Sequence, residues 1–199
     1  MPMLCRDMRF IHPFEYMSDN WKLACRRVKS KPCRFCNCSG HIKNHGFLRG
    51  LHPDKPSLEI RGIRFLCSDR YKNKGCGRTF SVLFSHILPR HSTRSRHLKD
   101  FFNTLLNFSN VHAAWYHSSV PFSIRTAYNW LKKLKNSQAI IRSNMRTAPR
   151  NHLEKTLEPH LETISLIRKQ SQLSDDYIAD YQQRYQTAFF FPKSPAQPS

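Results

Sequence analysis

Two pairs of cysteines carry the clearest chemistry in the sequence. Cys33 and Cys36 have two residues between them, a spacing that places two thiolates along one edge of a tetrahedral metal site. Cys67 and Cys76 follow later and can supply the opposite edge, although eight residues separate them. The cysteine count is seven, an odd number, and the first residues lack the apolar stretch of a signal peptide, so a disulfide scaffold is not expected. The four cysteines predict one Zn²⁺ site, whose binding would stabilise a small folded segment.

Other residues compete for this role. Cys38 could replace Cys36 through a Cys-x-Cys pair, and three histidines lie nearby in the sequence: His41, His45 and His52. Ordinary reduced thiols are the simplest alternative. A redox Cys-x-x-Cys is disfavoured because the pair does not sit where a strand runs into a helix. Cys5 and Cys25 have no evident partner.

The charge distribution points to a polyanionic partner. The formal net charge is +20, and it resides in residues 25–152, which hold 25 basic and four acidic side chains, a net charge of +21. Nucleic acid is the first candidate partner and an anionic membrane surface the second. No run approaches the roughly 18 apolar residues of a membrane span. We expect no membrane insertion, no small-molecule substrate, and a cytoplasmic, nucleoid-associated protein.

The order of elements predicts a small α+β fold. Residues 1–30 form a lead-in with a short helix that Ser18 can cap. Residues 31–91, rich in turn residues, carry the cysteine pairs and three β-like runs: Ile42 to Leu48, Leu58 to Leu66, and Thr79 to Leu83. A four-cysteine zinc ribbon is the expected structure of this segment.

Residues 92–150 have helical patterning. Helices are expected from about Ser95 to Asn107, from about Asn110 to His117, and from Ser123 to about Met145, the last as one helix or as two broken near Asn136-Ser137. Residues 151–188 form a helical extension, with a helix near 153–169 that Pro159 kinks or splits and another that opens at 174–176. Residues 189–199 are expected to be a disordered tail.

Several runs of residues resemble the N-terminal zinc ribbon of insertion-sequence transposases and related helper proteins. They are Cys33-Arg-Phe-Cys36, the stretch from Gly40 to Gly50, Arg61-Gly-Ile-Arg-Phe-Leu-Cys67, and Gly75-Cys-Gly-Arg-Thr-Phe-Ser81. In that family a Cys-Gly-Arg-Thr-Phe run closes the ribbon before a helix-turn-helix, and residues 111–131 resemble that helix-turn-helix. The resemblance covers about residues 31–135.

The sequence departs from this family in two respects. Residues 68–75 enlarge the second cysteine knuckle. The family's transposases also continue into a catalytic domain whose three separated carboxylates bind two metal ions. Here the acids after residue 152 lie on helices within 47 residues, too short a stretch for the large β-sheet domain that such carboxylates need. We therefore expect no enzymatic activity.

The third helix of residues 92–150 carries the expected DNA contacts. Ile124, Ala127, Tyr128 and Leu131 are predicted to face the core, which turns the remaining side chains of this stretch outward. By type, Arg125 suits guanine and Asn129 suits adenine, and the lysines suit phosphates. The predicted DNA-contacting set is Arg125, Thr126, Asn129, Lys132 and Lys133 on this helix, with Arg94 and Arg96 at the junction between ribbon and helices. A solvated basic face without any reading role is the alternative.

These observations favour a non-catalytic, transposase-like zinc protein that binds double-stranded DNA. It would be an accessory factor, a regulator or a remnant of a mobile element, with a transposase or a second copy of itself as a further partner. Two alternatives remain open: an RNA-binding zinc-ribbon protein and, less favoured, a metal-dependent nuclease. The sequence shows no Gly-rich phosphate loop and no nucleophile elbow.

Overall fold

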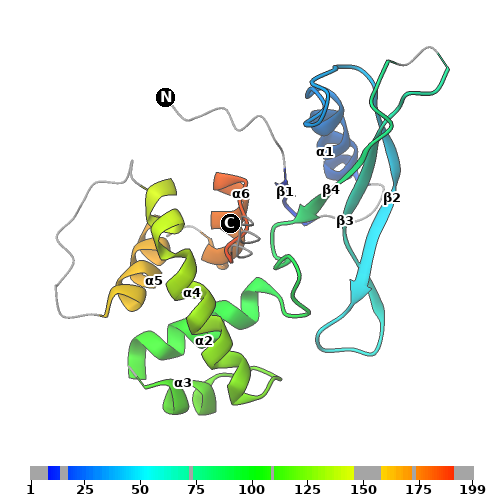
Figure 1. The fold of residues 1–199 in the computed structure, drawn as a ribbon. Helices are drawn as coiled ribbons and strands as arrows, with labels where there is room; N and C mark the ends of the chain where they lie inside the picture. Colours follow the sequence, from blue (N-terminus) through cyan, green and yellow to red (C-terminus); the bar gives the residue numbers. More distant parts are fainter. Residues whose placement is uncertain are drawn as a thin grey trace, which may run out of the picture. The chain divides into compact units, whose positions relative to one another are not determined.

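The computed structural model describes residues 9–13, 18–71, 74–108, 110–145, 158–171 and 174–190. Over these residues the chain forms a four-stranded mixed sheet and six helices, so the predicted small α+β class is confirmed (Figure 1). Packing divides the chain into two compact units. The sheet unit comprises Met1–Ile87 and Gln182–Thr187, and the helical unit comprises Leu88–Tyr181 and Ala188–Ser199. None of the described helices combines the length and apolarity needed to cross a membrane.

The sheet is built on one long hairpin. Strand β2 (Ile42–Leu51) pairs antiparallel with β3 (Leu58–Cys67), and β3 pairs antiparallel with β4 (Thr79–Phe84) (Figure 1). All three strands were predicted, and each runs slightly further than expected, β2 by three residues. Alternate residues of β3, Ile63, Phe65 and Cys67, are buried, as the period of a strand requires when one face covers a core.

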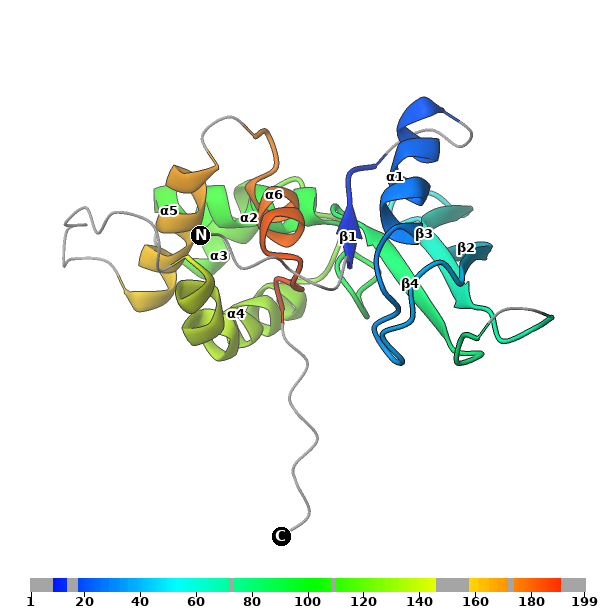
Figure 2. The ribbon, with the colours of Figure 1, turned by 90° about the horizontal axis from the view of Figure 1, so that it is seen from above.

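Helix α1 (Asp19–Lys29) covers this core. Its predicted N-cap is confirmed, because the Ser18 hydroxyl accepts a hydrogen bond of 3.2 Å from the backbone N–H of Trp21. Cys25 and Val28 lie on the buried side of the helix and join the hydrophobic cluster of the sheet, so α1 lies against one face of it (Figure 2).

A short strand that the sequence did not predict completes the sheet. Strand β1 (Phe10–Ile11) lies parallel to β4, giving the order β1-β4-β3-β2. The free edge of β1 is satisfied by a single side chain: Gln186 Oε1 accepts from the N–H groups of Arg9 (2.7 Å) and Phe10 (2.9 Å), and its Nε2 donates to Phe10 O (2.9 Å). Gln182 Nε2 donates to the carbonyls of Ser85 and Ile87 at 2.6 and 3.0 Å. Residues 182–187, which include the second half of the last helix, therefore belong to the sheet unit.

The helical unit is organised around one tryptophan. Its elements are α2 (Ser95–Phe108), α3 (Val111–His117), α4 (Ile124–Asn144), α5 (Pro159–Gln170) and the first half of α6 (Tyr177–Tyr185). The Trp130 ring on α4 lies 5.8 Å from Phe101 of α2, 6.1 Å from Trp115 of α3 and 6.2 Å from Phe122. These ring contacts join the three helices that were predicted to form the helix-turn-helix.

The structure settles the alternatives for α4 and corrects one of its core positions. The helix runs without a break through Ser137, which is fully buried, and Ser123 occupies the N-cap position without making a capping side-chain hydrogen bond. The core position predicted for Tyr128 is wrong, because this residue is 48% exposed. The buried face of α4 consists of Ala127, Trp130, Leu131 and Leu134. Tyr128 follows Ala127 directly, and its side chain lies outside this buried face.

The C-terminal part also departs from the predictions. Pro159 is the first residue of α5 instead of a kink inside it, as suits a residue without a backbone N–H, and the part of the predicted helix before residue 158 lies outside the described residues. The prediction of a disordered tail from residue 189 is wrong for Phe189 and Phe190, which are buried, and residues 191–199 lie outside the described residues. The Phe189 ring packs 5.7 Å from Tyr181 and 6.2 Å from Phe102.

The first prediction concerns the edge of β1. Gln186→Ala should lower the free energy of unfolding by about 1–2 kcal/mol, because it leaves three backbone groups of Arg9 and Phe10 without a protein partner. Chemical denaturation measures this loss. Amide exchange at Leu83 and Ser85, whose N–H groups donate to β1, should become faster. Gln183→Ala, a neighbouring glutamine, is the matched control, and equal losses from both variants would contradict the assignment.

Candidate metal centre

Four cysteine sulfurs converge in the sheet unit. The Sγ atoms of Cys33, Cys36, Cys67 and Cys76 all lie within 4.8 Å of one another. Two separations match a tetrahedral site closely: 3.8 Å between Cys33 and Cys76, and 3.7 Å between Cys36 and Cys67. Sulfurs at about 2.3 Å from one metal ion at the centre of a tetrahedron lie about 3.8 Å apart. The four predicted ligands are thus brought together in a geometry that a metal ion could occupy.

The first pair sits in a tight turn between α1 and β2. The N–H of Cys33 donates to Cys38 O (2.9 Å), and the N–H of Asn37 donates to Cys33 O (2.8 Å). Asn37 has a φ of 60°, a left-handed conformation that asparagine tolerates better than most residues. The N–H of Phe35 points at the Cys33 sulfur, 3.4 Å away. Such N–H donors favour the thiolate form that a metal ion requires.

The second pair explains how cysteines separated by eight residues can act as a knuckle. The N–H of Gly75 donates to the carbonyl of Ser68 at 2.9 Å and closes the base of the inserted segment. Cys67 and Cys76 therefore flank only two residues at that base, Ser68 and Gly75, which reproduces a Cys-x-x-Cys spacing across a gap in sequence. As in the first knuckle, a backbone N–H, here of Cys76, points at the sulfur of the first cysteine (3.5 Å).

Two glycines beside Cys76 make this closure possible. A Cβ atom on Gly75 would lie 2.7 Å from the Cys67 sulfur, a separation too short for any other residue to occupy without a shift. Gly77 has a φ of +69°, and its N–H donates to Cys67 O at 2.9 Å. The Gly-Cys-Gly triplet is thus required by the shape of the site.

The two knuckles differ in burial and in acidity. Cys33 and Cys67 are fully buried within the hydrophobic cluster that includes Ile42 and Phe65, whereas Cys36 and Cys76 are partly exposed. A hydrogen bond from the backbone of Cys38 lowers the pKa of the Cys36 thiol to about 6. Burial raises the pKa of the Cys67 thiol to about 12. A bound cation would have to displace the proton from Cys67, which links metal binding to the protonation of a buried group.

Two arginines connect the knuckles across the site. The Arg34 guanidinium from the first knuckle lies 4.7 Å from the Phe80 ring centroid, and that of Arg78, beside the second knuckle, lies 5.4 Å from the Phe35 ring. Four thiolates around a divalent ion carry a net charge of −2, so these guanidinium groups also provide a compensating positive field.

The competing ligands lie outside the cluster. Among the described residues, the grouping of potential ligands contains neither Cys38 nor any of the histidines His41, His45 and His52. The Cys38 thiol faces the carbonyl of Cys36 at 3.7 Å, and His52 Nδ1 accepts from the N–H of Asp54 at 3.1 Å. Cys25 packs in the core beside Asn44, and Cys5 lies outside the described residues.

The predicted DNA-contacting residues occupy two places in the helical unit. On α4, Arg125, Asn129 and Lys132 are exposed and share one face, and Thr126 is partly buried. Lys133 is also exposed, but its Nζ lies 3.0 Å from His91 Nε2, a partner that sequence patterning did not reveal, and burial lowers the pKa of its ammonium group. Arg94 is partly buried just before α2, and Arg96 is exposed in its first turn.

Comparisons with protein-family models, with curated proteins and with solved structures found no match for this chain. The resemblance to the transposase ribbon therefore rests on the motifs quoted above. Function has to be inferred from the arrangement of the residues themselves.

The second prediction concerns the metal. Purified full-length protein should contain close to one equivalent of metal ion per chain, and Cys67→Ser should abolish binding because it removes a buried ligand at a tetrahedral corner. Elemental analysis of the two proteins provides the measurement. Cys38→Ser is the matched control and should retain the metal. The ligand set is wrong if Cys38→Ser loses the ion and Cys36→Ser keeps it.

Proposed function

We propose that this protein is a non-catalytic, transposase-like DNA-binding protein in which a zinc ribbon accompanies a helix-turn-helix. The observation that carries the proposal is the outward face of α4, where Arg125, Asn129 and Lys132 are exposed side by side. Recognition helices present such side chains to base edges from their N-terminal part, and these three residues lie in the first three turns of α4.

Zinc is the ion that we propose for the four-cysteine site. Tetrahedral all-sulfur sites hold zinc or iron, and zinc is the usual ion of closed structural sites made from two knuckles. All four tetrahedral corners are occupied by cysteine, so no position is left open for a substrate or a reactive water. The two pairs lie on either side of the β2–β3 hairpin, an arrangement in keeping with a ribbon whose metal supports folding and takes no part in chemistry.

The helix-turn-helix proposal rests on the packing of α2, α3 and α4. The shared ring contacts of Trp130 hold the three helices together, and residues 118–123 connect α3 to α4. The sequence contains no acidic residue between Asp100 and Glu154, so α3 and α4 carry none. A face that is basic and lacks carboxylates attracts a polyanion without local repulsion.

The surroundings of α4 divide the proposed contacts into two kinds. Arg125 and Asn129, one helical turn apart, are proposed to read bases. Lys132, one turn further, is proposed to contact phosphate, as are Arg94 and Arg96 near the start of α2. Thr126 and Lys133 are proposed as secondary contacts, because Thr126 is partly buried and Lys133 is engaged with His91.

A mobile-element accessory factor, a regulator or a remnant of such an element would fit this chemistry, acting on DNA in the nucleoid with a transposase or a second copy of itself. The acids of α5 and α6 do not favour catalysis. Glu162 pairs with Arg142 at 2.7 Å, and Asp180 accepts from the Ser171 hydroxyl at 2.6 Å. These carboxylates serve internal contacts and are not gathered at a common centre.

The third prediction separates base reading from electrostatic attraction. On a preferred duplex selected from a random pool, Arg125→Ala or Asn129→Ala should weaken binding by about 1–3 kcal/mol, with little effect on random duplex. Lys132→Ala should weaken both duplexes alike and lower the salt slope by about one. Dissociation constants on both duplexes across a salt series provide the measurement.

Lys169→Ala on α5 is the matched charge control, because it removes an exposed lysine far along the chain from α4. The reading role of α4 is refuted if Arg125, Asn129 and Lys132 variants lose affinity equally on both duplexes. If structured RNA displaces the preferred duplex at equal concentration, the protein is an RNA-binding protein instead.

The fourth prediction concerns catalysis. Supercoiled plasmid incubated with the protein and Mg²⁺ or Mn²⁺ should remain intact, because the described acidic residues form no metal-binding group. Gel electrophoresis of the plasmid is the measurement. Cleavage that accompanies the protein through purification and disappears with a single Asp, Glu or His substitution would show that the protein is a nuclease.

A further inference from the structure

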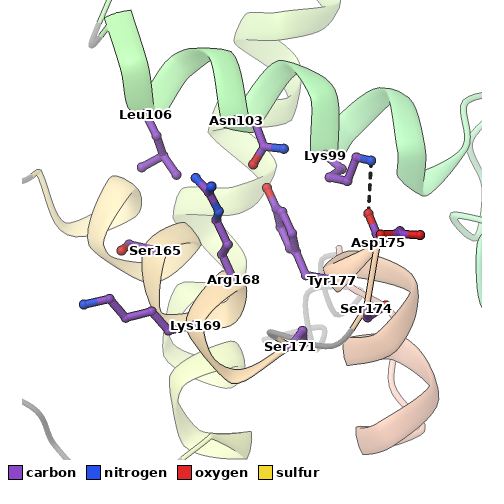
Figure 3. A pocket seen from close by; sticks show the side chains of 10 residues that line it. All are labelled: Lys99, Asn103, Leu106, Ser165, Arg168, Lys169, Ser171, Ser174, Asp175 and Tyr177. Atoms are coloured by element: carbon purple, nitrogen blue, oxygen red, sulfur yellow. Dashed lines mark hydrogen bonds between the residues drawn. The ribbon is translucent and has the colours of Figure 1, made fainter.

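A polar cavity lies within the helical unit, away from the α4 face. Its volume is about 450 Å³, and α2, α5 and the start of α6 line it (Figure 3). Its lining includes Lys99 and Asn103 from α2, Arg168 from α5, Tyr177 from α6 and the acidic residue Asp175 just before α6. No residue of the proposed DNA-contacting set belongs to its lining.

Two buried polar atoms in this cavity have no hydrogen-bond partner. They are the hydroxyl oxygen of Tyr177 and Oδ1 of Asn103. Tyr177 is only 4% exposed, and Figure 3 shows its hydroxyl pointing toward Asn103, with the Arg168 side chain beside it. A buried polar group left unpaired costs about 1–3 kcal/mol, and folded proteins rarely keep one without a ligand, an ion or a water to meet it.

Charges of both signs lie near these atoms: Lys99 and Arg168 line the cavity together with Asp175, and Asp100 and Asp176 also act on Tyr177. Among the described residues, no carboxylate forms an ion pair with the Arg168 guanidinium. Lys99 is held at the rim, where its Nζ donates to Asp175 O at 3.0 Å and lies 3.5 Å from Asp100 Oδ1. Burial raises the pKa of Tyr177, which keeps its hydroxyl protonated and able to donate. Among the side chains that line the cavity, Lys99, Arg168 and Lys169 carry positive charge and Asp175 alone carries negative charge, so the lining has a net positive charge.

The helix dipole explains why basic residues end α5, but it does not explain the arrangement of side chains in the cavity. Arg168 and Lys169 both lie in the last turn of this helix, where positive charge favours the helix dipole. That reason applies equally to both residues. Figure 3 shows that only Arg168 extends toward α2, alongside the Tyr177 ring, whereas Lys169 extends away. It also leaves the unpaired atoms of Tyr177 and Asn103 unexplained.

We propose that this cavity binds a phosphate monoester group. The terminal oxygens of such a group can accept from the Arg168 guanidinium in a two-point contact, from the Tyr177 hydroxyl and from the Lys99 ammonium group. The Asn103 amide can accept from a protonated phosphate oxygen or, after a flip, donate to an ionised one. The phosphate belongs either to a free ester such as a nucleotide or to the 5′ end of a nucleic acid strand. The site does not depend on the role proposed for α4.

The test begins with inorganic phosphate as the probe. Calorimetric titration of the full-length protein, with chloride keeping the ionic strength constant, should show saturable binding. Tyr177→Phe and Arg168→Gln should each weaken it by about tenfold, the effect of losing one hydrogen bond to a charged group. Lys169→Gln removes the same charge from the same helical turn and should leave binding within about twofold. Equal losses from Arg168→Gln and Lys169→Gln would indicate general attraction of anions and would overturn the proposal.

A stability measurement guards against a purely structural role for the tyrosine. Without phosphate, Tyr177→Phe should melt at the same temperature as the wild type or higher, because it removes an unpaired buried hydroxyl. A lower melting temperature would show that the hydroxyl is satisfied within the protein, and the proposed site would then fail. Arg168→Gln should leave the selectivity for the preferred duplex unchanged, so failure of this site and failure of the α4 proposal are distinguishable.

Two further probes identify the source of the phosphate. One arm compares a short single-stranded oligonucleotide carrying a 5′-phosphate with the same strand carrying a 5′-hydroxyl, and the other titrates adenosine 5′-monophosphate. A preference for the phosphorylated strand that Tyr177→Phe abolishes assigns the site to nucleic acid ends. Equal binding of the two strands, with Tyr177-dependent binding of the nucleotide, assigns it to free esters. Absence of Tyr177-dependent binding in every arm overturns the proposal.

Discussion

The approach of four cysteine sulfurs to one point is the constraint on which the sheet unit depends. Cys33 and Cys67 are buried in its hydrophobic cluster, so the candidate metal site is continuous with the core of the sheet unit. Bringing four thiolates this close without a cation would be opposed by their mutual repulsion. A bound ion reverses the sign of that interaction, and its binding free energy becomes folding free energy for β2, β3 and β4. The contacts of Arg34 with Phe80 and of Arg78 with Phe35 also connect the two knuckles.

The parts of the fold that the sequence could predict are those set by near neighbours. The Cys33-x-x-Cys36 spacing, the alternation along β3 and the Ser18 cap each depend on contacts within a few residues. The sequence could suggest Cys67 and Cys76 as a ligand pair, but it could not predict the conformation that brings them together. That conformation includes a hydrogen bond between Ser68 and Gly75 across the inserted segment. The α4 helix itself could be predicted, but the side of it that faces the core could not. Tyr128 and Trp130 are both large aromatic residues, so the sequence pattern did not show that Trp130 is the buried one. The pairing of β1 with Gln186 joins residues 176 apart in the chain, which no local pattern can reveal.

The distribution of charge has a structural counterpart in the helical unit. Its C-terminal acids accept hydrogen bonds inside the unit: Glu162 from Arg142, Asp180 from Ser171, and Asp176 from the N–H groups of Ile178 and Ala179 at the start of α6. Each of these carboxylates interacts with a nearby arginine, hydroxyl or backbone N–H group. It therefore offsets little of the positive charge on the exposed face of α4. The near-neutral extension thus supports the fold while the basic face stays available to a polyanion. In the cavity lined by Arg168, none of the described carboxylates forms an ion pair with its guanidinium, although Asp175 belongs to the lining.

The sheet unit, which holds the four clustered cysteines, depends on residues 182–187 from late in the sequence. Every motif that resembles the transposase ribbon and helix-turn-helix lies within residues 31–135, so a chain ending there would contain all of them. It would nevertheless lack Gln182, which satisfies the carbonyls of Ser85 and Ile87, and Gln186, which completes the edge of β1. An open strand edge and two unpaired buried carbonyls are both unfavourable, and an open edge invites pairing with another chain. Residues 182–187 are therefore part of the sheet unit, because they satisfy backbone groups of Phe10, Ser85 and Ile87.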